Sequence, residues 1–454
     1  MKRSAWRYLW TAHDIRKKLL VTVLLMALYR LASHVPVPGA DASVMKSIIA
    51  GGGAAGTLTG LLDMFSGGTV SKFSVLAMGV YPYITAQIIL QLLVPIIPAW
   101  QKRMEEDPRE GQKWMEKWTY YLSVPMAFLN AIGQINIFNS LAGQAGYGPV
   151  ISNFNLFGSS WLPSWAIVVS MTAGTMFGIW LGELISEFGI RNQGLSLIIF
   201  AGIVSQIPSS LQTILADAST RMIMIVFMAI FLTAIIFAIV VVQQGRRNVP
   251  VMYPGRRVGR GMSMPVKGTL PLMVNMAGMI PLIFAQSILT FPAVLAGFFV
   301  NQSGWLGSIS RSINSTFGGQ SNTYWILYFL SVVLFSFFYT DVLFSQQNYG
   351  ENLKKVGAQI PGVSRGVPTQ KYLTRVLRRI TFPGALFLGL VAIMPFILTL
   401  IMGAFGQGLA SRASGLLLVS SSGLLIVVGV VRDTFFNIDA ELKLRGYDDA
   451  QLIR

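Results

Sequence analysis

The sequence predicts an all-α polytopic membrane protein, and three observations support this prediction. Hydrophobic residues make up 53% of the 454 residues and charged residues only 12%, whereas a soluble domain carries about 25% charged residues. The apolar residues form ten runs that are long enough to cross a bilayer, and most Lys and Arg residues lie between these runs. With a mean hydropathy of +0.59, the chain has too little polar surface to cover a water-soluble globule.

Ten segments are expected to span the membrane, because a bilayer core of about 30 Å requires roughly 20 apolar residues in a helix. They are approximately residues 17–35, 73–94, 118–138, 163–184, 194–214, 221–242, 271–299, 323–344, 381–402 and 415–432. Pro82 interrupts the second segment, and Gly278 with Pro281 interrupts the seventh. Residues 48–65 are apolar but rich in glycine, which favours a re-entrant or half-inserted segment packed inside the protein.

Positive charge lies almost entirely on one side of this predicted topology. Of the 35 Lys and Arg residues, 29 fall at the N-terminus, in alternate loops or at the C-terminal end. The positive-inside rule places that side and both chain termini in the cytoplasm. The first basic and apolar run is expected to be a span, because no small-residue cleavage site follows it. Ten spans divide into two five-helix halves, 1–214 and 215–454, of inverted orientation.

No motif for catalysis, metal binding or cofactor binding stands out. Residues 51–56 match G-x-G-x-x-G, but a dinucleotide site also needs a preceding strand and a later acidic residue, and this stretch is a flexible apolar segment. His13 and His34 fall on opposite sides of the predicted membrane, and the chain has no cysteine. We therefore expect no enzyme activity, no metal and no cofactor.

Ionisable residues within the predicted spans are few. They are Arg30, Glu183 and Asp341, with Arg432 and Asp433 at the end of the last span. Such residues mark functional sites by default, but snorkelling or capping explains Glu183 and Asp341 more simply, because both lie near span ends. A five-plus-five secondary transporter is one alternative function, and it would place carboxylates deeper. A scaffold or insertase without a pore is a second alternative.

Loops 243–270 and 345–380 are unusually long and basic. Basic residues that only orient the chain in the membrane would each gain about 1 kcal/mol of binding free energy from anionic lipid. The Arg, Gly and Pro residues of these loops exceed what orientation requires. Their composition favours docking onto an acidic partner such as ribosomal RNA, through phosphate contacts.

Several long blocks of the chain resemble the SecY family of protein-conducting channels. The blocks occur at 32–41, 64–93, 174–194, 195–204, 274–292, 337–344 and 352–362, for example MFSGGTVSKFSVLAMGVYPYITAQIILQLL and VNMAGMIPLIFAQSILTFP. The resemblance covers essentially the whole chain. It implies an hourglass channel in the bacterial inner membrane, closed by an aliphatic ring and a plug helix. Such a channel translocates unfolded secretory polypeptides and releases transmembrane segments through a lateral gate.

The resemblance also implies roles for individual residues. The pore ring would comprise Val80, Ile84, Leu195, Ile199, Ile283 and Ile426. The plug would cover about 57–68, with Met64, Phe65, Ser66, Gly67 and Gly68 at its core. The lateral gate would carry the polar residues Thr85, Asn130 and Asn275, which we expect to form hydrogen bonds between helices. A ring of branched aliphatic side chains excludes water and ions by dewetting, yet deforms around a passing chain.

The two basic loops match those that dock the SecA motor and the ribosome in this family. Arg256 and Arg257 align with the basic pair of the first loop. In the second loop this chain departs from the family: the pattern P-G-I-R-P-G reads P-G-V-S-R-G at 361–366, so the family's arginine falls on Ser364. The docking role is carried over to Arg365, one place on. The implied partners are the SecE and SecG subunits, SecA, the ribosome, signal peptides and nascent chains, anionic lipids, SecDF and YidC.

Overall fold

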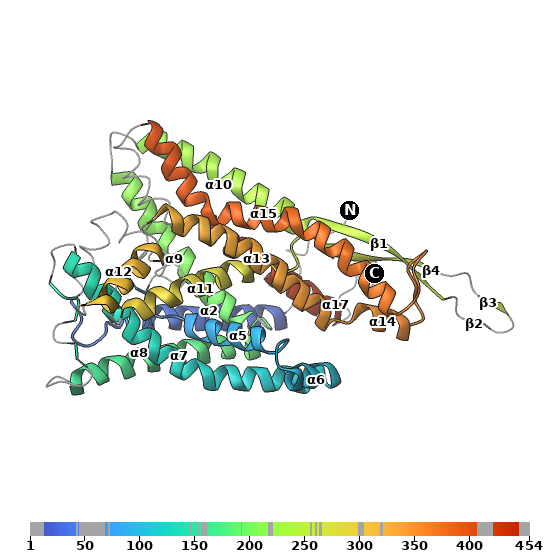
Figure 1. Cartoon of the computed structure of the whole chain (residues 1–454). Coiled ribbons are helices and arrows are strands. Elements are labelled where there is room, and N and C mark those ends of the chain that lie inside the picture. The colour runs from blue at the N-terminus through green and yellow to red at the C-terminus, as the bar shows by residue number, and fades with distance from the viewer. Residues whose placement is uncertain are drawn as a thin grey trace.

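The computed structural model describes residues 13–41, 44, 69–70, 73–144, 148–151, 154–155, 161–191, 193–216, 221–254, 257–258, 261–262, 266–297, 304–317, 321–405 and 421–444. Each of the ten predicted membrane segments corresponds to a helix (Figure 1). These helices are α2 (His13–Ala32), α5 (Tyr81–Leu93), α7 (Pro108–Gln144), α8 (Trp161–Phe188), α9 (Gly194–Ala216), α10 (Arg221–Gln244), α11 (Ile280–Gly297), α13 (Asn322–Gln346), α15 (Val367–Phe405) and α17 (Ser421–Leu444). Shorter helices lie between them: α6 (Pro98–Glu106), α12 (Trp305–Phe317) and α14 (Tyr349–Lys355).

Several of these helices are suited to crossing a bilayer. Among the described residues, five helices are long and apolar enough, or six if the bent pair of α5 and α6 counts as one span. Two further apolar helices are shorter, at Gly194–Ser205 and Ile280–Ala293. The all-α, multi-pass class is therefore confirmed, whereas the number of ten crossings stays a prediction.

Two of the predicted spans begin later than their sequences indicate. Helix α5 begins at Tyr81, with Pro82 in its first turn, and α11 begins at Ile280, followed by Pro281. Proline suits this position because the first amides of a helix have no partner within it. Gly278 precedes α11 with a positive φ of 63°. The prediction that these residues interrupt the spans is wrong, because they mark where the helices start.

The predicted loop 243–270 contains a β-hairpin instead. Strand β1 (Arg246–Tyr253) pairs antiparallel with β4 (Val266–Met273), and the two-residue strands β2 (Arg257–Val258) and β3 (Gly261–Met262) form a second pair. Val249, Val251 and Leu272 are buried in a cluster with Leu373 and Leu377 of α15, which explains the ordered strands. Residues 271–273, which the sequence assigns to the seventh span, therefore belong to β4. We call this end of the molecule the hairpin end; α12 lies at the opposite end (Figure 1).

The helix ends also correct the predicted loops. Helix α15 begins at Val367, so part of the predicted loop 345–380 is helical. Helix α7 begins at Pro108, before the predicted start of the third span, and α17 extends to Leu444. Apolar length alone cannot locate these ends, because a helix continues through polar residues outside the bilayer.

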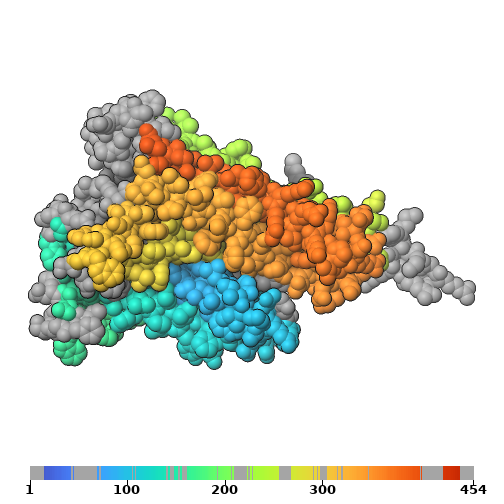
Figure 2. All heavy atoms as spheres, in the orientation of Figure 1, coloured from blue at the N-terminus to red at the C-terminus, as the bar shows by residue number. Residues whose placement is uncertain are grey.

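The helices pack in two groups that follow the two halves of the sequence. In the first group α8 contacts α2, α7 and α9, while α5 contacts α7; in the second, α13 contacts α11 and α15, and α17 contacts α10 and α15. Between the groups, α11 meets α5 and α7 on one side, and α9 meets α10 and α17 on the other. Figure 2 shows the first of these seams, where the blue α5–α6 region lies against the gold and orange part of the second group.

Helices α8 and α9 approach closely at Gly194, the first residue of α9. A Cβ at this position would overlap the backbone oxygen of Gly182 in α8. We expect Gly194→Ala to force the helices apart and to destabilise the protein by about 1–3 kcal/mol, seen as a lower midpoint of thermal unfolding in detergent. Gly143→Ala is the matched control, because a Cβ there meets nothing within 4 Å. Equal midpoints for the two variants would contradict this account.

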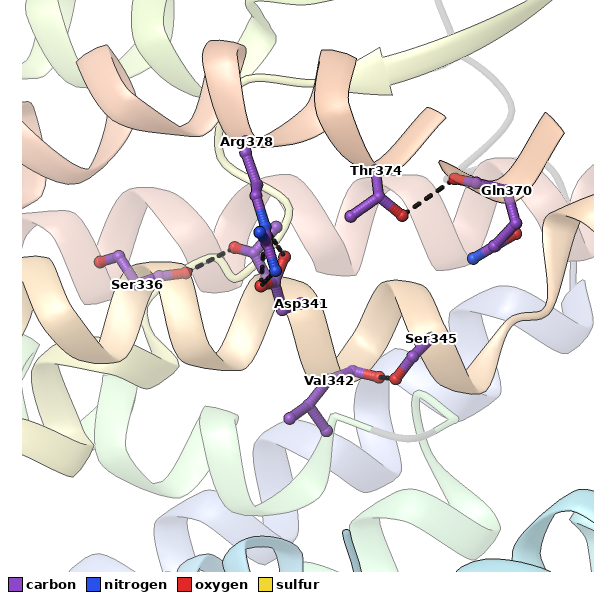
Figure 3. Close-up of polar contacts among 8 residues, drawn as sticks. Ser336, Asp341, Val342, Ser345, Gln370, Thr374 and Arg378 are labelled. Atoms are coloured by element: carbon purple, nitrogen blue, oxygen red, sulfur yellow. Dashed lines mark hydrogen bonds and ion pairs between the residues drawn. The ribbon is translucent and has the colours of Figure 1, made fainter. Parts of the chain in front are cut away.

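An ion pair joins α13 to α15 towards the hairpin end. Arg378 donates from Nη2 to Oδ2 of Asp341 at 2.7 Å, and from Nε to the same oxygen at 3.1 Å (Figure 3). The two side chains are 63% and 34% exposed, and such pairs contribute at most about 1 kcal/mol. The pair connects the helices on either side of α14, so Asp341 has a structural partner at the base of the second basic loop.

Candidate functional site

A cavity of about 710 Å³ lies where α5, α8, α9 and α11 meet. Its apolar lining includes Ile84, Ile88, Leu195, Ile199, Ile280, Ile283 and Phe284. Its polar lining includes Gln87, Gln91, Glu116, Glu183, Ser186, Glu187 and Ser196. Both halves of the chain contribute to this cavity, so it lies on the boundary between them.

The six residues predicted for the pore ring gather at one hydrophobic cluster. Val80, Ile199, Ile283 and Ile426 are buried within it, and Ile84 and Leu195 pack against it. These residues come from α5 and the turn before it, and from α9, α11 and α17. Four of them, Ile84, Leu195, Ile199 and Ile283, also line the cavity. The cavity is therefore lined in part by branched aliphatic side chains that both halves supply.

The polar lining lies toward the hairpin end of the same cavity. Along α5 the lining residues pass from Ile84 in the first turn to Gln91 in the last. Glu183 and Glu187 belong to the last two turns of α8. Glu183 thus lines the cavity, although its position in the sequence suggests a snorkelling or capping side chain. Glu116 and Glu187 also line the cavity, and the sequence did not indicate either of them. The lining of the cavity is therefore mixed, with carboxylates and amides from α5, α7 and α8 beside branched aliphatic side chains from α5, α9 and α11.

A second apolar cluster closes the seam between α5 and α11. Its buried members are Ile88, Ala277, Phe284 and Tyr339, with Ile84, Leu92, Ile280, Phe335 and Leu343 packed against them. The ring of Phe284 lies edge-on to Tyr339 at 5.3 Å and to Phe335 at 6.1 Å between centroids. Because Ile88 belongs to the first half and Phe284 to the second, apolar packing holds this seam closed.

The polar residues predicted for the lateral gate make local contacts instead. Thr85 donates its hydroxyl to the oxygen of Pro82 at 2.9 Å, and Asn275 donates from Nδ2 to the oxygen of Gly278 at 3.1 Å. Nδ2 of Asn130 is buried without a hydrogen-bond partner among the described residues. Within the described part of the chain the expected hydrogen bonds between helices are therefore not formed, because nearby carbonyls of the same segments compete for Thr85 and Asn275.

The second basic loop packs against the β-hairpin. Arg365 is exposed and donates from Nε to Oε1 of Gln359 at 3.3 Å. Gln359 and Met252 of β1 exchange backbone hydrogen bonds of 2.9 and 2.8 Å. The two basic segments thus form one projection, with Arg257 at the start of β2. Arg256 and the predicted plug at 57–68, including Met64, Phe65, Ser66, Gly67 and Gly68, lie outside the described residues.

Comparison with known proteins agrees with this arrangement. The SecY family model matches residues 74–435. The chain belongs to the SecY family. It is 37% identical to the protein translocase subunit SecY of Streptomyces galbus and 36% identical to that of Mycobacterium tuberculosis, over 96% of both chains in each case.

Two solved structures share the fold. One is of a SecY protein whose plug domain is described as stabilising the closed state of the translocation channel; its TM-score is 0.60 at 18% identity, over 94% of this chain and 92% of that one. The other is described as a protein-conducting channel, with a TM-score of 0.57 at 17% identity over the same shares of the two chains. At this identity the two structures support the all-α channel fold alone.

A short internal repeat, which the sequence analysis did not identify, relates the two sides of the seam. Residues 79–90 read GVYPYITAQIIL and residues 278–289 read GMIPLIFAQSIL. Glycine, proline, isoleucine, alanine, glutamine and the final Ile-Leu occupy equivalent positions. The alignment makes Ile84 the equivalent of Ile283, so the repeat alone could have located two ring residues and paired α5 with α11.

Proposed function

We propose that this chain is the pore-forming subunit of a translocase, conducting unfolded secretory polypeptides across the bacterial plasma membrane. The observation that carries the proposal is the aliphatic cluster that contains Val80, Ile84, Leu195, Ile199, Ile283 and Ile426, four of which line the cavity between the two halves. The name of the relatives, protein translocase subunit SecY, supports the same function. A secondary transporter is not supported, because the relatives of this chain are named protein translocase subunits.

The proposed mechanism follows from the two apolar clusters. A polypeptide enters the cavity and displaces the aliphatic ring, which excludes water and ions again once the chain has passed. An apolar segment of the polypeptide leaves sideways between α5 and α11, where it gains about 0.3–0.6 kcal/mol per apolar residue on reaching lipid. The contact of Ile88 with the Phe284 cluster breaks during this exit, and contacts with the departing segment replace it.

The hairpin end is proposed to face the cytoplasm, since the side of the chain with 29 of the 35 Lys and Arg residues includes the hairpin. The projection that carries Arg257 and the exposed Arg365 is the proposed docking surface for SecA and the ribosome. The relatives are named as subunits, which supports assembly with SecE and SecG. Transient contacts with SecDF, YidC and anionic lipids complete the proposed set of partners.

Charge reversal at Arg365 tests the docking surface. We expect Arg365→Glu to reduce SecA-driven translocation into vesicles about tenfold, which corresponds to about 1.4 kcal/mol, while assembly of the complex is unchanged. Lys113→Glu makes the same charge change at an exposed position of α7, outside both basic loops, and is the matched control. Equal translocation by the two variants would refute the role of Arg365.

A crosslink from the ring tests the proposed function itself. The chain has no native cysteine, so Ile84→Cys offers a single thiol at the inner lining of the cavity. We expect this thiol to crosslink to a secretory chain stalled in transit. Ile236→Cys, on α10 and 39% exposed, is the control and should give no crosslink. A transporter or a scaffold without a pore predicts no adduct at either position.

A further inference from the structure

Helix α12, in the connection between α11 and α13, turns its apolar side outward. Trp305 is 71% exposed, Leu306 42% and Ile309 48%, whereas Ser310 is only 5% exposed. Gly307 is buried as well, and Phe317 packs into the apolar cluster of the second half. With 3.6 residues per turn, the three exposed side chains fall on one stripe of the helix. Figure 2 shows the gold surface of this region open at the left end of the molecule.

The corresponding helix after α5 has the opposite arrangement. In α6, Trp100 and Met104 turn toward α7, and the ring of Trp100 lies 5.1 Å from that of Trp114. The exposed residues of α6 are small or polar: Pro98, Ala99, Gln101, Lys102, Arg103 and Glu106. A connecting helix of this protein can therefore cover its apolar side, and α12 does not. Three adjacent large apolar side chains in water would be unfavourable, so the outer stripe of α12 indicates a non-aqueous contact.

The position of α12 identifies this contact as lipid. The helix follows α11, which ends at Gly297, and precedes α13, which begins at Asn322, so it lies at the depth where two apolar helices leave the bilayer. Tryptophan is favoured at that boundary, because its ring is apolar and its N–H is polar. A different side of α12, with Ser308 and Arg311, is exposed and polar. An apolar stripe beside a polar stripe is the pattern of a helix lying in the membrane surface.

We propose that α12 lies along the bilayer surface, with Trp305, Leu306 and Ile309 inserted between lipid headgroups and acyl chains. Such helices insert to about 5–10 Å. The contact holds the ends of α11 and α13 farthest from the hairpin at a fixed depth, and α11 forms one side of the seam described above. This inference depends on the multi-pass membrane character of the chain and not on the proposed channel function.

Two single-cysteine variants of the full chain test the proposal. Ile309→Cys places a thiol on the apolar stripe, and Ser308→Cys places one at the neighbouring exposed position, rotated by about 100°. Each variant is labelled with an environment-sensitive fluorophore and reconstituted in phosphatidylcholine nanodiscs, with or without nitroxide-bearing lipid. We expect blue-shifted emission and strong quenching by the nitroxide lipid at position 309. At position 308 we expect quenching mainly by dissolved iodide.

The possible outcomes separate lipid from other contacts. Equal iodide quenching at the two positions would overturn the proposal, since the stripe would then face water. Protection of position 309 from both quenchers would also overturn it, because a second protein copy or another subunit would then cover the stripe. Normal translocation by both labelled variants leaves the channel function intact whichever result is found, so the two proposals fail independently.

Discussion

A covalent link between α5 and α11 should abolish translocation. Ile88 and Phe284 are buried in the same cluster, although they belong to opposite halves of the chain. With no native cysteine present, Ile88→Cys combined with Phe284→Cys provides one reactive pair across the seam. Once a short bifunctional maleimide with a reducible spacer joins them, the halves cannot separate. We expect export into proteoliposomes to fall at least about tenfold, a barrier increase of about 1.4 kcal/mol or more, and to recover after reduction of the spacer.

A second pair within one half provides the control. Phe284 and Phe335 lie on α11 and α13, with ring centroids 6.1 Å apart. Phe284→Cys with Phe335→Cys therefore shares the loss of the Phe284 ring, removes one further ring and carries a similar crosslink, but it bridges no seam. If export continues with the Phe284/Phe335 crosslink and stops with the Ile88/Phe284 crosslink, translocation requires the two halves to separate. Equal inhibition of both variants would remove the support for a gate at this seam.

The membrane class and the helical segments could be predicted from apolar length, but the helix ends could not. The run 271–299 is continuous in hydropathy, yet Leu272 and Met273 belong to a strand and only the residues from Ile280 onward are helical. Leu272 packs into the hydrophobic base of the hairpin, so its apolar character serves a contact outside the bilayer. Tertiary packing of this kind leaves no signal in a hydropathy profile.

The candidate site was predictable in part. The ring residues were assigned by resemblance to a family, and the structure brings them into one hydrophobic cluster; their role as a pore ring stays a prediction. The acidic lining was missed because Glu116 and Glu187 are far apart in sequence and lie on different helices. The sequence also indicated the wrong kind of contact at the seam between α5 and α11: it indicated polar residues, and the seam is closed by apolar ones. Polar residues within a span are readily predicted to be functional, whereas Ile88 and Phe284 are indistinguishable by sequence from residues that face lipid.

A polar side chain in the ring should make the resting protein leak ions. Ile199 is 4% exposed, lies in the aliphatic cluster and lines the cavity. We expect Ile199→Asn to hydrate the constriction and so weaken the dewetting barrier. Each 1.4 kcal/mol lost from that barrier raises ion flux about tenfold. The measurement is single-channel conductance in planar bilayers without a translocating chain.

A neighbouring isoleucine separates a leak from general damage. Ile185 is fully buried in the same hydrophobic cluster but does not line the cavity. Ile185→Asn leaves a polar group buried, which lowers stability by about 1–3 kcal/mol, but it adds no water to the constriction. If Ile199→Asn conducts ions and Ile185→Asn does not, the seal against ions depends on the residues of the cluster that line the cavity. If both variants conduct equally, the seal is a property of overall packing, and the ring has no special role in excluding ions.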